Sequence, residues 1–558
     1  MLRSTDNHVA DVPGSNKQSR VIVITLAIIV VATLLRLRGI AFGLPALLDP
    51  DEPIFIMTGL KLIRGQTLNP GWFGHPGTTT IYALAVIELA TFGAWTASGR
   101  FESAKAFGQA IYTDPGIIFL PGRIFILICG LATIVLTMVI ARRLFGSRVA
   151  LIAGLLLAID PVHIRYSQII RTDMHATVFV LLEVLAALVI VERGRTRDYL
   201  LAAVWLGFAV ATKWPAGTCI AAVVGATLLR LGERRDTVPK ATRNMLVFGA
   251  ASIAALFVAS PYLFLDTATV LDNIRGEERP FHLGATGHGF LGNVGWYAAG
   301  PFATALGTVG LVFAIAGLWI GYRRSRAFAA VVVPVFAAFL LMISVQALVW
   351  ERWAVPLLPL LTIAAAVGLV GAGEWARARF GTTAQRSAIV AGLAAVAIPL
   401  LLTGRAQARE RDTDTRLLAG AWAKRHIPPG STVVVEHAAF DILGQPWRFL
   451  YPMGSVGCVD VRAALGGKIA YSTVDKRRGG KPVVDIGSVD PARFASCRGD
   501  WAITANWDRY LVEPAHFRGE IANYARLARG GRIVATFRPQ PGRIGGPIVR
   551  VVRLAQPR

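Results

Sequence analysis

The first residues that could carry out chemistry lie in one stretch, residues 47–82, with long apolar segments on either side. It carries Asp49, Asp51, Glu52 and His75. Ionisable groups at a membrane boundary are costly to keep, so they usually mark a site that binds or reacts with something. Carboxylates that precede a short interfacial helix can also simply cap its positive N-terminus, and capping and catalysis are compatible. We therefore take this stretch as the candidate site around which the chain is organised.

Complementary groups follow in segments that we predict on the same membrane face. Asp173 supplies a further acid. The groups that can be cationic are His75, Arg165, Arg171, Lys213, Arg275, Arg279 and Arg352. Carboxylates beside clustered bases at a lipid boundary suit a substrate with a phosphate head and a hydrocarbon tail. Because carboxylates do not bind phosphate, we expect them to remove a proton from an acceptor.

Structural explanations compete with these roles. Arg171 and Asp173 can form a local ion pair at a helix start. Lys213 and Arg352 stand next to tryptophans, and cations beside interfacial tryptophans are ordinary features of membrane belts. Each of these residues can therefore be explained with or without a ligand.

Two lone histidines, His163 and His282, have no partner visible in the sequence, and we expect both on the surface. The chain has no HExxH, GxSxG or Walker-type phosphate loop, so metalloprotease, serine hydrolase and nucleotide-driven activities have no support. No cysteine spacing resembles a zinc or iron–sulfur site. The chemistry must come from the acids and bases above.

The composition indicates what must position these groups. The chain has 558 residues, of which 54% are hydrophobic and only 16% are charged, which is too apolar for a soluble enzyme. The net charge of +24 would suggest nucleic acid in a soluble chain, but arginines in short loops between apolar segments are explained by membrane orientation. We expect an integral membrane protein that binds no nucleic acid, with an uncleaved signal anchor at its basic N-terminus.

Eleven apolar segments are long enough, or nearly so, to cross a bilayer. They lie at about 21–40, 121–141, 149–160, 173–191, 199–212, 215–231, 244–265, 295–321, 327–349, 353–373 and 387–404. A further apolar segment, 78–98, contains Glu88. We expect a polytopic α-helical membrane protein with about 11 transmembrane helices, whose orientation depends on whether 78–98 also crosses.

The positive-inside rule arbitrates between the two orientations. If 78–98 lies along or dips into the outer leaflet, every arginine cluster falls on one side together with the basic N-terminus. We take this arrangement, with a cytoplasmic tail at 1–20, a transmembrane domain at 21–404 that includes a long external loop at 41–120, and everything after 404 outside. The external face then collects residues 41–120, 160–173, 211–217, 266–294, 349–353 and the C-terminal region.

After Arg405 the composition becomes that of a soluble protein, and we expect residues 405–558 to form one small α/β domain outside the cytoplasm. TRLLAGAWAKRHI is predicted to be a helix that ends at Pro428. The predicted strands are STVVVEH, DWAITAN, RIVATF and IVRVVRL.

Cysteines and tryptophans add two further expectations. In an oxidising compartment Cys458 and Cys497 can form a disulfide, whereas Cys129 and Cys219 lie in apolar segments and are expected in the core. Tryptophans of the C-terminal region can stack on sugars or belong to its core: Trp422, Trp447, Trp501 and Trp507.

A set of motifs in a fixed order gives the most specific indication. They are DPDEP at 49–53, FGHPGTTTIY at 73–82, RLFG at 143–146, SQIIRTDMHATVFVLLEVLAAL at 167–188, GFAVATKWPAG at 207–217, ERWAVPLLPLL at 351–361 and DTRLLAGAWAKRHIPPGSTV at 414–433. Their order resembles the GT-C superfamily of polytopic glycosyltransferases, particularly its protein O-mannosyltransferase and lipid A aminoarabinose-transferase branch. The resemblance covers most of residues 20–435.

The resemblance implies roles for the acids. Asp51 matches the family's catalytic aspartate, Glu52 completes the acidic pair, and Asp173 matches the second acidic position. A divalent metal, Mg or Mn, held by Asp51 and Asp173 is one alternative, as in the oligosaccharyltransferase branch, although the relatives that resemble this chain most often manage without one.

The resemblance also implies a place for the lipid phosphate. His75 and Pro76 fall where relatives carry a basic residue or a histidine before a proline pair, close to that phosphate. Here Gly77 replaces the second proline, and Pro53 follows the acidic pair closely, so the local backbone departs from the family's pattern. The candidates for the phosphate are, in decreasing order, His75, Arg171, Lys213 and Arg352.

The implied activity is an inverting glycosyltransferase. It would move a hexosyl or pentosyl group from a polyprenyl-phosphate donor to a lipid, polysaccharide or protein acceptor at the outer face of the inner (plasma) membrane. A transporter or flippase of a lipid-linked sugar is the main alternative, because it would also need many spans and intramembrane charges. A non-catalytic scaffold that binds envelope polymers is the third.

Overall fold

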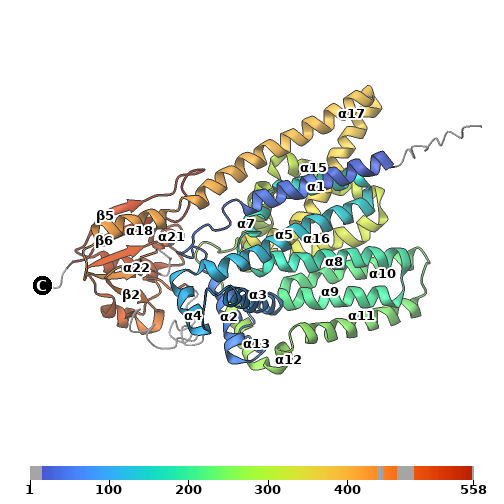
Figure 1. The fold of residues 1–558 in the computed structure, drawn as a ribbon. Coiled ribbons are helices and arrows are strands. Elements are labelled where there is room, and N and C mark those ends of the chain that lie inside the picture. The colour runs from blue at the N-terminus through green and yellow to red at the C-terminus, as the bar shows by residue number, and fades with distance from the viewer. Residues whose placement is uncertain (1–14, 437–440, 443, 461–482, 556–558) are drawn as a thin grey trace, which may run out of the picture.

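The computed structural model describes residues 15–436, 441–442, 444–460 and 483–555. A bundle of long helices forms one end of the molecule, and a mixed β-sheet with flanking helices forms the other (Figure 1). Of the tail predicted at 1–20, residues 1–14 lie outside the described residues.

Long apolar helices build the bundle, and among the described residues eight are long and apolar enough to cross a membrane. They contain α1 (Ser15–Leu37), α3 (Thr78–Ala97), α5 (Gly116–Phe145), α8 (Thr172–Arg193), η1 (Trp214–Cys219) with α10 (Ile220–Gly232), α11 (Val238–Ala259), α14 (Gly289–Tyr297) with η2 (Ala298–Phe302) and α15 (Ala303–Arg324), and η4 (Glu351–Leu357) with α17 (Leu358–Asp412). Shorter helices are α6 (Ser147–Ile159), α9 (Thr196–Thr212), and η3 (Phe328–Val332) with α16 (Val333–Ser344). All eleven predicted apolar segments are mainly helical, although 21–40, 244–265 and 327–349 extend beyond the ends of α1, α11 and α16. The chain is a polytopic α-helical membrane protein.

Helix α17 joins the bundle to the sheet domain. Its backbone turns at Gly381, where φ is +87° and ψ is −176°, so two helical halves lie on either side of this residue. Glycine adopts a positive φ without a steric penalty. The second half continues to Asp412 and runs from the bundle to the sheet domain (Figure 1). The change of composition at Arg405 therefore falls inside a helix.

Short helices fill the segments between the long ones. They are α2 (Glu52–Gly65), α4 (Ala104–Thr113), α7 (Pro161–Tyr166), α12 (Tyr262–Leu265) and α13 (Thr267–Glu277). Helix α3 is seen almost end-on in Figure 1, while α5, α8 and α9 run across the page. The segment 78–98 therefore lies crosswise to the helices of the bundle.

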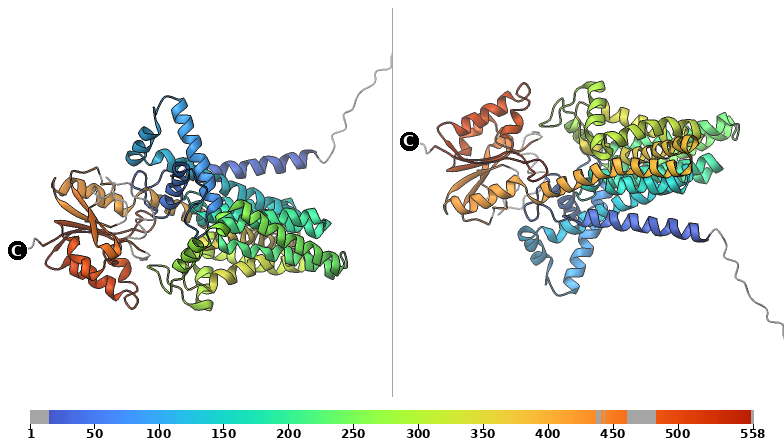
Figure 2. Two further views of the ribbon diagram at one scale, coloured as in Figure 1. Left: turned by 90° about the horizontal axis from the view of Figure 1, so that it is seen from below. Right: turned by 90° about the horizontal axis from the view of Figure 1, so that it is seen from above.

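Helix α1 lies at the edge of the bundle (Figure 2) and is fixed by Arg36, whose side chain is fully buried. The guanidinium donates to the carbonyl oxygens of Leu157 and Ala158 at 3.2 and 2.9 Å, and one nitrogen lies 2.7 Å from His163 Nδ1. His163, which the sequence placed on the surface, is fully buried. Its partners were not visible because Arg36 lies 127 residues away in the chain and Thr133, 2.8 Å from Nε2, lies 30 residues away.

The C-terminal domain has a six-stranded sheet with the order β3-β2-β1-β4-β6-β5. The strands are β1 (Thr432–Val435), β2 (Arg448–Pro452), β3 (Cys458–Asp460), β4 (Trp501–Thr504), β5 (Arg532–Phe537) and β6 (Val549–Arg553). Strand β1 is parallel to β2 and β4, and the other pairs are antiparallel. Helices α18 (Thr415–His426), α21 (Trp507–Tyr510) and α22 (Arg518–Ala528) flank the sheet, with the short turns η5 (Gly454–Val456) and η6 (Pro491–Cys497).

Most sequence-based expectations for this domain are confirmed. The four predicted strands correspond to β1, β4, β5 and β6, and the predicted helix is α18. The sequence missed β2 and β3, which have only five and three residues and no regular alternation. Cys458 and Cys497 form a disulfide. The four tryptophans pack in or against the two cores of the domain, and Trp447 is 2% exposed.

Two fully buried carboxyl groups lie beyond the carboxyl ends of the parallel strands. Glu436 accepts hydrogen bonds from Tyr524 Oη and from the backbone N–H groups of Ala505 and Asn506. Asp485 accepts from Tyr510 Oη at 2.8 Å and from Asn506 Nδ2 at 3.0 Å. All these donors are neutral. Burial, together with the nearby Asp485, raises the pKa of Glu436 to about 7.

Candidate active site

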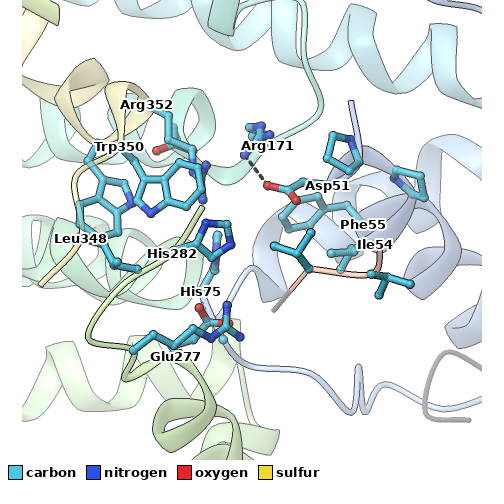
Figure 3. Close-up of a pocket in the computed structure, with 18 of the residues that line it drawn as sticks. Asp51, Ile54, Phe55, His75, Arg171, Glu277, His282, Leu348, Trp350 and Arg352 are labelled. Carbon is cyan, nitrogen blue, oxygen red and sulfur yellow. Dashed lines mark hydrogen bonds and ion pairs between the residues drawn. The ribbon is translucent and has the colours of Figure 1, made fainter. Parts of the chain in front are cut away.

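A cavity of about 1470 Å³ lies where the bundle meets the sheet domain. Six of the seven predicted site residues line it: Asp51, His75, Arg171, Asp173, Lys213 and Arg352. They come from the start of α2, the loop before α3, the start of α8, the junction of α9 and η1, and η4. Asp51, His75, Arg171 and Arg352 are labelled in Figure 3. Residues more than 300 positions apart in the chain therefore share one site.

Arg171 holds the acidic stretch in place. Its guanidinium donates to Asp51 Oδ2 at 2.5 Å (Figure 3). It also donates to both oxygens of Asp49, at 3.0 Å each. Arg171 thus pairs with these two acids and not with Asp173, as the local ion pair suggested by the sequence would require. Asp51 occupies the N-cap position of α2 but makes no side-chain capping hydrogen bond. Its carboxylate is therefore not used in capping.

The charges around Asp51 keep it ionised. Burial alone would raise the pKa of this carboxyl, but the positive charges of Arg171 and Arg352 outweigh it and lower the pKa to about 2. Burial also opposes the charge of Arg171, yet Asp49 and Asp51 raise the pKa of its guanidinium above the ordinary value. The pair is ionised across the physiological range.

Lys213 forms a buried ion pair with Asp173. The side chains are 4% and 1% exposed, so Lys213 does not snorkel toward a lipid surface. Burial lowers the pKa of its ammonium group to about 8, although Asp173 opposes this change. Asp173 Oδ2 is buried and has no hydrogen-bond partner among the described residues. One carboxylate oxygen is therefore left for a ligand.

His75 is fixed against the residues that follow α9. Pro76 and Lys213 form an antiparallel bridge, and Trp214 N–H donates to the His75 carbonyl oxygen at 3.0 Å. The imidazole lies against Trp72, with ring centroids 5.2 Å apart. Gly77 has a φ of +72°, which proline cannot adopt, so the replacement of the second proline has a structural reason.

The imidazole of His75 is neutral at pH 7. Burial, assisted by the positive charges of Lys213 and Arg352, lowers its pKa to about 3. Nδ1 is buried without a partner among the described residues. His75 can therefore exchange a hydrogen bond with a ligand, but it does not supply the positive charge that the sequence analysis allowed for it.

Arg352 is the cation with the least compensation in the cavity. It is 9% exposed, and no hydrogen bond or ion pair joins its guanidinium to another described residue. Its guanidinium lies 4.2 Å from the centre of the Trp350 ring. His282 also contacts Trp350, with ring centroids 5.0 Å apart (Figure 3). An unpaired buried charge is strongly unfavourable, which indicates that an anion completes this site.

Glu52, the seventh predicted residue, lies behind the cavity wall. It is fully buried and receives two hydrogen bonds from Arg123, at 2.9 and 2.7 Å, and one from Ile170 N–H at 3.0 Å. Because Arg123 is in α5 and Ile170 precedes α8, this carboxylate joins three segments around Asp51 and Arg171. The signal that could have revealed its partner is a lone arginine within an apolar segment.

Sequence reasoning missed residues that later segments bring to the cavity. Glu277 comes from the end of α13, and His282, predicted on the surface, comes from the loop after it. Arg416, Asn506 and Arg509 come from the C-terminal domain. No local pattern could have placed them there, since their position depends on how the two domains meet.

The donor set does not suit a divalent metal. The carboxylate of Asp51 is bound by Arg171 and that of Asp173 by Lys213, so each acid already faces a cation. Within the described ranges, no group of three or more histidine, cysteine or acidic side chains is arranged to hold a metal ion. The alternative of a metal bound between these two acids therefore has no support in the geometry.

Comparisons with known proteins bear on the fold. The family model described as dolichyl-phosphate-mannose-protein mannosyltransferase matches residues 116–264. ArnT from Cupriavidus metallidurans in the apo state has a similar structure, with a TM-score of 0.51 and 16% sequence identity over 98% of this chain and 100% of that one. No curated protein matches the sequence.

The oligosaccharyltransferase from Archaeoglobus fulgidus in its apo form is also similar, with a TM-score of 0.54 and 12% identity over 92% of this chain and 73% of that one. The same values hold for the structure of this enzyme, AglB, in complex with an inhibitory peptide and a dolichol-phosphate.

Proposed function

Since the chain has the fold of the GT-C membrane glycosyltransferases, we propose that it transfers a sugar, with inversion, from a polyprenyl-phosphate donor to an acceptor hydroxyl. The observation that carries the proposal is the unpaired, buried guanidinium of Arg352 in the same cavity as the ionised Asp51. The pairing of an anion site with a carboxylate matches what this reaction requires. A dolichol-phosphate bound to AglB is an example of such a lipid in a protein of this fold.

The cationic side of the cavity would hold the departing lipid phosphate. Negative charge grows on this phosphate as the glycosidic bond breaks, and fixed positive charges stabilise that change. Arg352 can bind the phosphate without giving up a carboxylate, whereas Lys213 must share its charge with Asp173. His75, being neutral, contributes a hydrogen bond. We therefore rank Arg352 first and Lys213 second, with His75 after them.

The acidic side would activate the acceptor. Asp51 Oδ2 is held by Arg171, and the other oxygen has no hydrogen bond to a described residue, so it can accept the proton of an acceptor hydroxyl. The acceptor oxygen then bonds to the sugar carbon, and the electrons of the broken bond pass to the lipid phosphate. Asp51 is a weak base in the empty site, but a bound phosphate screens the positive charges of Arg352 and Arg171 and raises its pKa.

We further propose that this cavity faces the outside of the inner (plasma) membrane, with the tail at 1–20 in the cytoplasm, the membrane domain at 21–404 and the soluble domain at 405–558 outside. The disulfide between Cys458 and Cys497 supports this orientation, because such bonds persist in oxidising compartments. The crosswise position of α3 supports the choice of one external loop over 41–120.

Transfer assays with purified protein test the proposal. Radiolabelled polyprenyl-phosphate hexoses and pentoses are offered with native membrane acceptors to the wild type, Arg352→Ala and Asp51→Asn. Arg275→Ala serves as a matched control, since this arginine is mostly exposed and, among the described residues, forms an ion pair with Asp272 alone. We expect the wild type and the control to transfer the sugar of one donor, and we expect Arg352→Ala and Asp51→Asn to transfer none.

The outcomes separate the competing activities. Asp51→Asn should retain binding of polyprenyl phosphate while losing transfer, because it keeps the cations in place. If no donor releases its sugar although the wild type binds polyprenyl phosphate, the enzyme proposal is wrong and transport of a lipid-linked sugar becomes the better explanation. Equal transfer by wild type and Asp51→Asn would reject Asp51 as the base.

A further inference from the structure

We propose that the soluble domain positions Arg352 for the lipid phosphate through residues 281–287, which we call the clamp loop. The inference rests on the proposed function, since it takes Arg352 as the phosphate ligand. It assigns a task to the C-terminal domain, whose residues reach the cavity but do not include the acids and bases of the reaction.

One side of the clamp loop packs against the soluble domain. Leu283 is 2% exposed and belongs to the hydrophobic core of that domain, where its neighbours include Tyr510 and Phe517. Arg509 Nη2 donates to the Leu283 carbonyl oxygen at 3.2 Å. The ring of Phe281 stacks on His516 with centroids 5.2 Å apart. The loop is thus built into the domain's core, although it belongs to the membrane half of the chain.

The other side of the clamp loop is paired with the segment that leads to Arg352. Val349 N–H donates to the Ala285 carbonyl oxygen at 2.9 Å, and Gly287 N–H donates to the Ala347 carbonyl oxygen at 2.8 Å. These bonds form an antiparallel bridge between Thr286 and Leu348. Arg352 follows Val349 by only three residues, so the position of this bridge limits where its guanidinium can lie.

The clamp loop also contacts Arg352 indirectly, through the aromatic rings of His282 and Trp350. His282 meets Trp350 edge to face at 5.0 Å, and Trp350 carries the guanidinium of Arg352 at 4.2 Å on its face. Stacking on an aromatic ring orients a guanidinium without neutralising it. A carboxylate partner would fix Arg352 equally well but would consume the charge that the phosphate needs. Support by rings and backbone bonds leaves that charge available.

Two substitutions loosen the clamp from opposite sides. Arg509→Ala removes the hydrogen bond to Leu283 from the domain side. Gly287→Ala acts on the membrane side, since an added Cβ would lie 2.6 Å from the Ala347 carbonyl oxygen. Arg425→Ala is the control, because this exposed arginine of α18 donates, within the described part of the chain, only to the Ala421 carbonyl oxygen of its own helix.

Binding of polyprenyl monophosphate to the full-length protein in detergent is the first readout. We expect each clamp variant to weaken binding about 5- to 30-fold, which corresponds to the loss of one or two hydrogen bonds or stacking contacts. In an Arg352→Ala background the same substitutions should change binding less than about twofold, because they act through Arg352. Additive losses in that background, or unchanged binding, would overturn the proposal.

Hydrogen exchange of residues 347–353 is the second readout and needs no ligand. It should rise in both clamp variants and not in Arg425→Ala, and a protected segment in either clamp variant contradicts the inference. If exchange rises as expected but wild type binds no polyprenyl phosphate, the clamp loop does position Arg352, and the proposal of a polyprenyl-phosphate donor is wrong.

Discussion

The buried pair of Glu52 and Arg123 allows the catalytic role implied for Glu52 to be tested. Glu52→Gln keeps the shape of the side chain and an acceptor oxygen, but it removes the charge that faces a fully buried guanidinium. Leaving one partner of such a pair uncompensated costs about 3–5 kcal/mol. This is a large fraction of the stability of an ordinary protein domain, so the variant should unfold at a clearly lower temperature.

The assay is thermal unfolding in detergent, combined with transfer measured per folded molecule at a temperature where both proteins are folded. We expect a lower melting temperature and transfer within a few-fold of wild type, because Glu52 does not reach the cavity. Glu192→Gln is the control: its pair with Arg143 is substantially exposed, and such pairs contribute no more than about 1 kcal/mol.

Two results would refute this reasoning. If Glu52→Gln melts like wild type, the pair does not hold α2, α5 and the start of α8 together. If it melts as expected but transfer falls about a hundredfold or more, the loss is of the size of general acid–base catalysis and Glu52 takes part in the chemistry.

Three further predictions concern charge and covalent bonds. The pKa of Glu436 in the folded protein is about 7, above that of an unfolded glutamate. Its contribution to the stability of the fold is therefore complete below about pH 4.3 and is lost as the pH rises through about 7. The melting temperature of wild type should rise more on a shift to about pH 5 than that of Glu436→Gln. Lys213 has a pKa of about 8, so titrations of donor binding should show affinity falling between pH 7 and 9, and this alkaline loss should disappear in Lys213→Arg. Reduction of Cys458–Cys497 should cost about 2–4 kcal/mol of stability, measured by denaturant unfolding with and without reductant.

The helices and much of the candidate site were predictable, because their signals lie in short segments or in the order of motifs along the chain. Apolar segments of sufficient length identified the helices of the bundle, and the positive-inside rule grouped the segments that hold Asp51, Asp173 and Lys213, which line one cavity. Charge complementarity was enough to group the acids with the bases. It could not pair them, since the local choice of Arg171 with Asp173 is replaced by contacts across 120 residues of chain.

The rest depended on packing that no single segment encodes. His163 and His282 looked alike in the sequence, yet one anchors Arg36 inside the bundle and the other meets Trp350 at the cavity. The charge of His75 also follows from its surroundings, because burial and two neighbouring cations remove it. The contribution of Asn506 and Arg509 requires the relative placement of the two domains, which composition does not give.

The second half of α17 sets the orientation of the soluble domain by helical phase. It continues without a break from Gly381 to Asp412, and its end is tied to the domain, where Gly545 N–H donates to the Glu410 carbonyl oxygen at 3.1 Å. Each residue of an α-helix adds a rotation of about 100° and a rise of about 1.5 Å. Substitutions along this helix are therefore tolerated far better than a change in its length: one inserted residue would turn the edge with Asn506 and Arg509 away from the cavity, whereas seven would nearly restore the direction and raise the domain by about 10 Å.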